Sequence, residues 1–254
     1  MIKNEPLVPI VSKGNILVEP IWDKPIDDFE GPLYQDYIAD HPNYKHILVR
    51  SSVNQMLQKA AKNLPDSYQL VVRAGHRPIE VQYKLLEMVK YGYAKENPSA
   101  SDYESLAFAR QYVADPAIKL PPHCCGAAVD VDMYDTKTGK LVDFGCPMNT
   151  DGDIAHVYTD KINSEQASNR EILRQAMLSA DFAPHPNEWW HFSYGDKMWA
   201  KFYSKSAAIY GLVERELRCY ERYEQTSNSN RPTGKQRPDS RQLFWWIIAN
   251  HRHG

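Results

Sequence analysis

The stretch that most constrains the fold is GAAVDVDMYD, residues 126–135, in which apolar and acidic residues alternate. Such alternation is typical of a β-strand. The preceding residues, PPHCC, place His123 seven positions before Asp130, with a glycine and two alanines between them. Small residues let other groups pack closely against the backbone, as in a sheet core or around a bound ion. The segment is therefore either a core strand that begins beside a histidine or part of a metal site.

Helical patterns surround this strand. They cover residues 51–63, 78–91, 101–114, 164–180 and about 213–224. Ser51 or Ser52 is the expected N-cap of the first helix. Pro78 suits the first turn of the second helix, and Ser101 with Glu104 forms a capping box for the third. Helices therefore make up a large part of the chain.

Two further β-rich runs, at 68–74 and 188–194, accompany the alternating segment. Residues 1–50 show weak periodicity and are expected to wrap around the domain as an irregular segment with short strands. Strands and helices in this mixed order, with short connections, predict an α+β fold in which a small antiparallel sheet is backed by helices.

The chain divides by composition into a domain at 1–224 and an extension at 225–254. Residues 225–241 are polar and rich in Ser and Pro, as in linkers, and LFWWIIA at 243–249 is apolar. An exposed apolar segment usually marks an interface. We therefore expect the extension to dock on the domain or to support a homo-oligomer.

Composition excludes several classes of protein. Hydrophobic residues make up 43% of the chain, and the formal net charge of -2 gives no basic field for nucleic acid. No apolar run approaches the roughly 20 residues of a membrane span. The N-terminus has no signal-peptide pattern, and four cysteines without a CxxC pair favour reduced thiols. These features predict a cytoplasmic protein.

Two segments carry candidate metal ligands. The pair His123 and Asp130 is weak evidence alone, and so is EWWH, with Glu188 and His191, because odd spacing on a strand sends side chains to opposite faces. Near a strand end or a bulge, however, both can approach one ion. Two histidines and an aspartate leave one position of a zinc site open for water, and Glu188 could take a proton from that water.

A third motif, RAGHRP at 73–78, follows a predicted strand and places Arg77 where the next helix begins. A guanidinium held there could donate two hydrogen bonds to a developing oxyanion or to a carboxylate. The alternative is an arginine that only caps a surface turn. Three histidines, at 41, 46 and 185, stand near prolines and are expected to be exposed.

The motifs GHRP, HCCGAAVD, ASNREILRQAM and EWWHFSYGDKMWA occur in this order, and together they resemble the D-alanyl-D-alanine dipeptidases of the vancomycin-resistance type. These enzymes belong to the zinc DD-peptidase and hedgehog-like superfamily. The resemblance covers roughly residues 20–212. It implies the superfamily's fold, a small antiparallel sheet backed by helices, and thus a zinc dipeptidase domain.

The resemblance also implies roles for individual residues. His123, Asp130 and His191 would bind one zinc ion per chain. Glu188 would act as general base on water at the zinc and pass the proton to the leaving amine, and Arg77 would stabilise the oxyanion. The implied substrate is D-alanyl-D-alanine or a similar short D,D-dipeptide.

The departures from the family pattern concern substrate recognition and leave the metal set intact. Pro121 stands where the family has a serine, and His76 stands where it has a tyrosine. Asn149 replaces an acidic residue near the substrate amine, and Asp151 or Asp153 could substitute for it. Asn149, Asp151 and Pro121 are therefore the candidate substrate-binding positions.

Two alternatives remain open at this point. The altered recognition residues are compatible with a D,D-carboxypeptidase or endopeptidase that acts on larger peptidoglycan peptides. A zinc-binding interaction module without catalysis, as in some hedgehog-like domains, is the other alternative. The presence of Glu188 and Arg77 argues against it.

Overall fold

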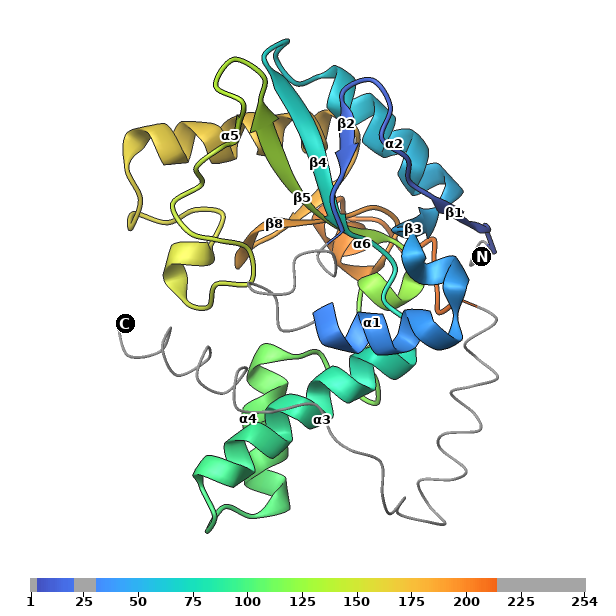
Figure 1. Ribbon diagram of the computed structural model, residues 1–254, viewed down its shortest axis with the longest axis vertical. Helices are drawn as coiled ribbons and strands as arrows, with labels where there is room; N and C mark the ends of the chain where they lie inside the picture. The colour runs from blue at the N-terminus through green and yellow to red at the C-terminus, as the bar shows by residue number, and fades with distance from the viewer. Residues whose placement is uncertain (1–3, 21–30, 214–254) are drawn as a thin grey trace.

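The computed structural model describes residues 4–20 and 31–213 (Figure 1). The expected helix at 213–224, the 225–254 extension and Cys219 lie outside the described residues. Cys124, Cys125 and Cys146 are free thiols, as expected. Among the described residues, no helix combines the length and apolar character that crossing a bilayer requires.

The centre of the molecule is a mixed sheet with the strand order β2-β4-β5-β8-β7. Its strands are β2 (Ile16–Val18), β4 (Tyr68–Ala74), β5 (Ala128–Asp135), β7 (Ala183–His185) and β8 (Glu188–Ser193). All neighbours along this path pair antiparallel except β2, which runs parallel to β4. The predicted α+β fold is confirmed, with a parallel edge strand that the sequence pattern did not indicate.

Shorter strands complete the β structure. Strand β6 (Lys140–Leu141) pairs with the end of β5 across a turn. Strands β1 (Leu7–Pro9) and β3 (Leu48–Arg50) form a separate two-stranded sheet. The N-terminal segment thus contributes short strands, as expected.

Helices α2 (Ser51–Lys62) and α5 (Ser164–Ser179) pack against each other and lie behind the sheet in Figure 1. The helical spacing over 164–180 predicts a buried apolar stripe that includes Ala167, Leu173, Ala176 and Met177, and the last three are buried in α5. Ala167, also assigned to that stripe, is exposed. The helix instead buries Arg170, which is 4% exposed.

Helices α3 (Ile79–Glu96) and α4 (Asp102–Tyr112) lie side by side as an arm that extends away from the sheet (Figure 1). The predicted capping box of α4 is present, with the Ser101 side chain and the Glu104 side chain each bound to the other's backbone N–H. Helix α1 (Gly31–Asp40) contacts α3, and α6 (Lys197–Phe202) contacts β7. Two short 3-10 turns, η2 (Pro42–Lys45) and η4 (Asp153–Ala155), lie in connecting segments.

The predicted N-cap of α2 is wrong. The N-cap position is Arg50, whose side chain makes no capping hydrogen bond. Ser51 and Ser52 lie in the first turn, and both hydroxyls donate to the carboxylate of Glu5 at 3.1 and 2.9 Å. The same carboxylate accepts the backbone N–H of Ser52 at 2.9 Å. A residue far away in the sequence therefore caps this helix.

Buried Arg170 holds the loop between β6 and α5. Its guanidinium donates to the carbonyl of Phe144 at 2.8 and 2.6 Å, to that of His156 at 2.7 Å and to that of Ile154 at 2.9 Å. The guanidinium carbon also lies 5.9 Å from the centre of the Trp189 ring, next to Glu188 in β8. One side chain of α5 thus binds both ends of the segment that contains Asn149 and Asp151.

Candidate metal centre

His123 opens a short 3-10 turn, η3 (His123–Cys125), that leads into β5. Gly126 ends this turn in a left-handed conformation with φ of 67°. This backbone conformation favours glycine, and an added Cβ would also displace a terminal methyl group of Leu7, which lies 2.6 Å away. The turn presents the His123 ring, which is 6% exposed, toward the sheet.

The hydrogen bond from the His123 ring to the backbone identifies the nitrogen that can bind a metal. Nδ1 lies 2.7 Å from the carbonyl oxygen of Gly75. A carbonyl only accepts, so Nδ1 carries the proton and Nε2 of the neutral ring keeps its lone pair. The lone pair of Nε2 therefore faces the interior of the site.

Asp130 and His191 are held together by the sheet. They are directly opposite partners in the antiparallel pairing of β5 with β8. Side chains of opposite partners lie on the same face of a sheet and close to each other. The register of these two strands therefore brings together an aspartate and a histidine that are 61 positions apart in the sequence.

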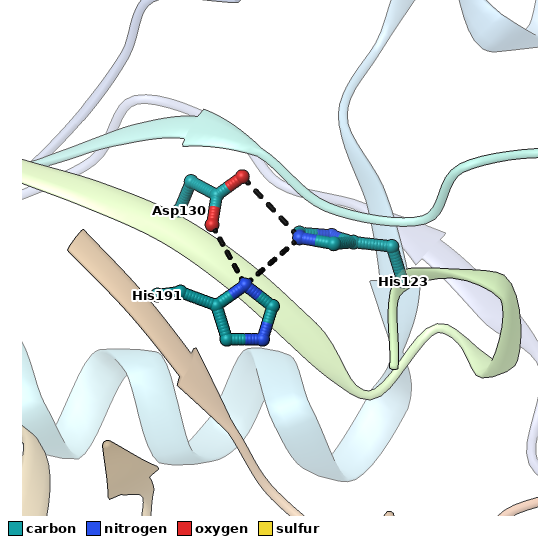
Figure 2. A group of neighbouring side chains, drawn as sticks. All are labelled: His123, Asp130 and His191. Carbon is teal, nitrogen blue, oxygen red and sulfur yellow. Dashed lines mark hydrogen bonds and ion pairs between the residues drawn. The ribbon is translucent and has the colours of Figure 1, made fainter. Parts of the chain in front are cut away.

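The donor atoms of these three residues converge at one point, as Figure 2 shows. His123 Nε2 lies 3.1 Å from His191 Nδ1 and 3.3 Å from one oxygen of Asp130, and His191 Nδ1 lies 3.1 Å from the other oxygen. Tetrahedral zinc with bonds of about 2.0–2.1 Å separates its ligand atoms by about 3.3 Å. These separations, in which each histidine nitrogen faces a different oxygen of Asp130, are therefore close to those between ligands of one zinc ion.

The chemistry of the donors also fits a cation. Burial alone would raise the pKa of Asp130, but His123 and His191 outweigh that effect and hold it well below its ordinary value of 3.8. The aspartate is therefore ionised, and a metal ion that took the place of the ring protons facing it would meet this carboxylate and the nitrogen lone pairs of both histidines. A cation is attracted by all the electron donors of such a buried set. Without a cation, bringing these donors together away from water is unfavourable.

Glu188 reaches the same site through a break in strand pairing. Pro184 pairs with Phe192, whereas the next residue, His185, pairs with Glu188, so the register shifts between them. This irregularity places Glu188, three positions before His191, on the same side of the strand as His191. Glu188 Oε2 is 3.5 Å from His191 Nδ1. The expectation that a bulge would bring the two residues together is confirmed.

The Glu188 carboxylate is suited to exchange a proton with water. Burial among the site residues raises its pKa above the ordinary value of 4.5, and the charge of His191 opposes this shift. The side chain nevertheless keeps 39% of its surface exposed. A carboxylate with a raised pKa that water can reach has the properties of a general base.

Arg77 lies between β4 and α3, close enough to Glu188 for its charge to lower the pKa of that group. Its backbone N–H donates to the carbonyl of His123 at 3.2 Å. One of its guanidinium nitrogens, Nη1, donates to Oε1 of Gln82 at 2.8 Å. Arg77 is half-buried, and its contacts tie the segment between β4 and α3 to the turn that carries His123.

The candidate substrate-binding residues lie outside the donor cluster. Pro121 is buried, and its carbonyl accepts the backbone N–H of Cys124 at 3.1 Å. Asn149 is half-buried with a φ of 61°. Asp151 is exposed, and its charge contributes to the raised pKa of Tyr112 at the end of α4. Asp153 pairs instead with Lys161 at 3.2 Å.

Sequence reasoning missed three residues beside the site. Gly75 and Gln82 contact His123 and Arg77, and nothing in the local sequence marks them for this role. His185, expected to be exposed, is partly buried, and its ring centre lies 5.3 Å from that of His191. Burial is the main cause that lowers the pKa of His185 to about 3.

A cluster of two histidines and an aspartate, with a glutamate and an arginine beside it, defines the class of metal-dependent hydrolases. The family model described as D-ala-D-ala dipeptidase, of peptidase family M15, matches residues 36–209. The chain belongs to this family of peptidases, which confirms the resemblance and makes the protein a metallopeptidase. A non-catalytic binding module is therefore not supported.

Curated relatives have the same description. A D-alanyl-D-alanine dipeptidase of Synechocystis sp. is 29% identical over 250 residues, covering 83% of this chain and 92% of the relative. One of Streptomyces coelicolor is 26% identical and covers 66% of this chain and 80% of the relative. A solved structure of VanYB in complex with D-alanine-D-alanine covers 74% of this chain and 86% of that chain, at 18% identity and a TM-score of 0.37. Family membership follows from the sequence matches alone.

Proposed function

We propose that this protein hydrolyses D-alanyl-D-alanine or a similar short D,D-dipeptide, with one zinc ion held by His123, Asp130 and His191. The observation that carries the proposal is the convergence of His123 Nε2, His191 Nδ1 and the two oxygens of Asp130, at separations of 3.1, 3.1 and 3.3 Å, with Glu188 beside them. The names of the curated relatives supply the substrate class.

Zinc at this site would polarise the scissile carbonyl and lower the pKa of its water to about 7. Glu188 takes a proton from the attacking water and delivers it to the nitrogen of the leaving D-alanine. Its raised pKa suits both steps, because the group must first accept the proton and then release it. Its exposed surface gives water access.

Arg77 stabilises the negative charge that develops on the carbonyl oxygen. A guanidinium is always charged and donates hydrogen bonds in a fixed fork, which suits an oxyanion. Asn149 and Asp151 are the proposed contacts of the substrate amine. Pro121 stands where the family pattern has a serine, so its ring offers no hydroxyl to the substrate. At this position the substrate is recognised by the shape of the ring.

The changes at Pro121 and Asn149 motivate a second candidate, a D,D-carboxypeptidase or endopeptidase that acts on larger peptidoglycan peptides. The two functions differ in whether a free amine is required. Cleavage of D-alanyl-D-alanine together with resistance of its N-acylated form supports the dipeptidase. The reverse preference supports the second candidate.

The test of the proposed base is Glu188→Ala. We expect the variant to keep a stoichiometric zinc content and to lose dipeptide hydrolysis by at least about 100-fold, because a positioned base contributes about 10²–10⁴-fold. Metal analysis and a D-alanyl-D-alanine cleavage assay measure the two effects. Glu171→Ala, which removes an exposed carboxylate of α5, serves as the matched control.

A Glu188→Ala variant that cleaves at the native rate would show that Glu188 is not the base. His123→Ala tests the ligand set in the same assays. It is expected to lose zinc, and a stoichiometric zinc content in that variant would contradict the assignment of the ligands.

A further inference from the structure

Residues 114–123 form a segment whose two ends lie beside Arg77. At one end the carbonyl of Ala114 accepts a hydrogen bond at 2.8 Å from the side chain of Gln82, which also bonds Arg77. At the other end the carbonyl of His123 accepts the backbone N–H of Arg77 at 3.2 Å. The residues between these ends therefore run along the border of the proposed site.

A buried carboxylate inside the segment holds its backbone in place. Asp115 is 7% exposed, and Arg110 donates two hydrogen bonds to one of its oxygens at 2.9 and 2.7 Å. The other oxygen accepts the backbone N–H of Ala117 at 2.9 Å, and the Asp115 carbonyl accepts that of Lys119 at 3.1 Å. Lys119 therefore belongs to a turn whose backbone is fixed.

The Lys119 side chain offers an exposed ammonium group near the proposed base. Among the residues that the structure describes, none forms an ion pair with it. Burial lowers the pKa of His185 most, and the charges of His191 and Lys119 lower it further, so Lys119 lies within electrostatic reach of this ring. His185 Nδ1 in turn lies 3.9 Å from Glu188 Oε2. A cation without a partner thus stands on the His185 side of Glu188.

The proposed substrate carries a charged group to which no residue has yet been assigned. A free D,D-dipeptide ends in a carboxylate, which lies about one residue's length, about 3.8 Å, beyond the scissile bond. Glu188 is proposed to act on the leaving nitrogen, and the carboxylate belongs to the same leaving residue. The carboxylate is therefore expected close to Glu188. Arg77 is assigned to the oxyanion, which leaves the ammonium of Lys119 as the cation for this group.

We propose that Lys119 is a specificity-determining residue, whose ammonium group binds the C-terminal carboxylate of the leaving D-alanine. This inference rests on the proposed dipeptidase function and adds to it the requirement for a free C-terminus. Pro121, in the same segment, offers the substrate no hydroxyl, and Lys119 supplies a polar contact in its place. An internal bond of a longer peptide has no carboxylate at this position, so the contact disfavours endopeptidase activity.

The test compares D-alanyl-D-alanine with D-alanyl-D-alaninamide, which keeps the free amine and the scissile bond but ends in a neutral amide. Both are measured on the full-length, zinc-loaded enzyme, native and Lys119→Gln. For the dipeptide we expect Lys119→Gln to raise KM by about 5–10-fold and to leave kcat nearly unchanged, since a charge-assisted hydrogen bond at a partly exposed site is lost. For the amide, kcat/KM should be the same in both proteins.

Two further variants separate this contact from a general effect of charge. Lys119→Arg keeps a cation on the same turn and should keep KM for the dipeptide close to the native value. Lys137→Gln removes the same charge from the exposed turn that follows β5 and should leave both substrates unaffected. Zinc content should be native in all three variants, because neither lysine belongs to the donor cluster.

A native KM for the dipeptide in Lys119→Gln, or an equal change of kcat/KM for the dipeptide and the amide, would overturn the inference. If the amide is cleaved too slowly, its inhibition constant against dipeptide hydrolysis replaces kcat/KM, with the same expected outcomes. A native enzyme that does not cleave the dipeptide would overturn the proposed function together with this inference. That result is distinct from a failure of Lys119 alone, in which the native enzyme cleaves the dipeptide.

Discussion

Gly75 is the residue on which the orientation of His123 depends. Its carbonyl accepts the His123 Nδ1 proton at 2.7 Å. A Cβ at this position would lie 2.6 Å from the carbonyl oxygen of Leu48 and 2.7 Å from a methyl group of Ile47. Any side chain at position 75 would thus push the backbone away from the β3 region and move the carbonyl that orients the ligand.

We predict that Gly75→Ala lowers the affinity for zinc by about 10–100-fold, the usual effect of disturbing a partner that orients a metal ligand. Competition with a chelator of known affinity measures this change. Gly14→Ala is the control, because Gly14 is exposed, has a φ of 59° and has no atom within 4 Å of the added Cβ. It should lose stability and keep its affinity, and native zinc affinity in Gly75→Ala would contradict the prediction.

The residues proposed for the metal centre, and Arg77, could be singled out from the sequence because they lie in short motifs that occur in the order of a known family. The residues that orient them could not. Gln82 bonds to Ala114, 32 positions away, and His123 bonds to Gly75, 48 positions away. A local pattern carries no information about which distant carbonyl a buried amide or imidazole will meet, so these contacts became visible only in the fold.

At the scale of elements, the cap of α2 comes from Glu5 rather than from a local serine. Burial alone would raise the pKa of the Glu5 carboxyl, but hydrogen bonds from Ser52 and Ser51 outweigh this and hold it below its ordinary value of 4.5. A carboxyl whose pKa is lowered on folding stabilises the native state above its ordinary pKa. This contribution is lost as the pH falls through the lowered value.

We predict that Glu5→Gln lowers the free energy of unfolding by about 1 kcal/mol at pH 7, the usual size of a helix-capping contribution. The difference from the native protein should start to shrink as the pH falls below 4.5 and should vanish once the pH has passed the lowered pKa, where Glu5 of the native protein becomes neutral. Denaturant titrations at several pH values measure both effects. Glu87→Gln removes an exposed carboxylate that lies 3.9 Å from Lys90 and should change stability little. A pH-independent difference for Glu5→Gln would contradict the argument.

The lengths of elements were less predictable than their existence. The predicted end of α3 at residue 91 is wrong, because the helix continues to Glu96. Gly92 looks like a helix end in the sequence, since glycine is a poor helix former. In the fold Gly92 is buried within α3, which packs along α4, and this packing outweighs the low helix propensity.

At the scale of the whole molecule, the division of the chain into a domain at 1–224 and an extension at 225–254 remains a proposal. The described part already contains the sheet, the helical arm and the donor cluster. The apolar run at 243–249 is the feature that suggests self-association. Catalysis and association should therefore be separable.

We predict that a chain ending at residue 224 retains the native kcat on the dipeptide and sediments as a monomer. The full-length chain should sediment as an oligomer. Trp245→Ser combined with Trp246→Ser in the full-length chain is the matched variant and should also reduce association. Equal sedimentation of all three proteins would contradict a role for the extension in self-association.

The buried guanidinium of Arg170 has a consequence for how this protein can evolve. It donates hydrogen bonds to the carbonyls of Phe144, Ile154 and His156. The residues between Phe144 and Ile154 therefore form a loop whose two ends are fixed and whose own residues can be exchanged. The anchors are backbone atoms and do not themselves restrict the side chains at 147–153, although the left-handed backbone of Asn149 and Gly152 does. Libraries randomised over the other positions of this segment could therefore explore new substrates while the strands that carry Asp130 and His191 stay unaltered.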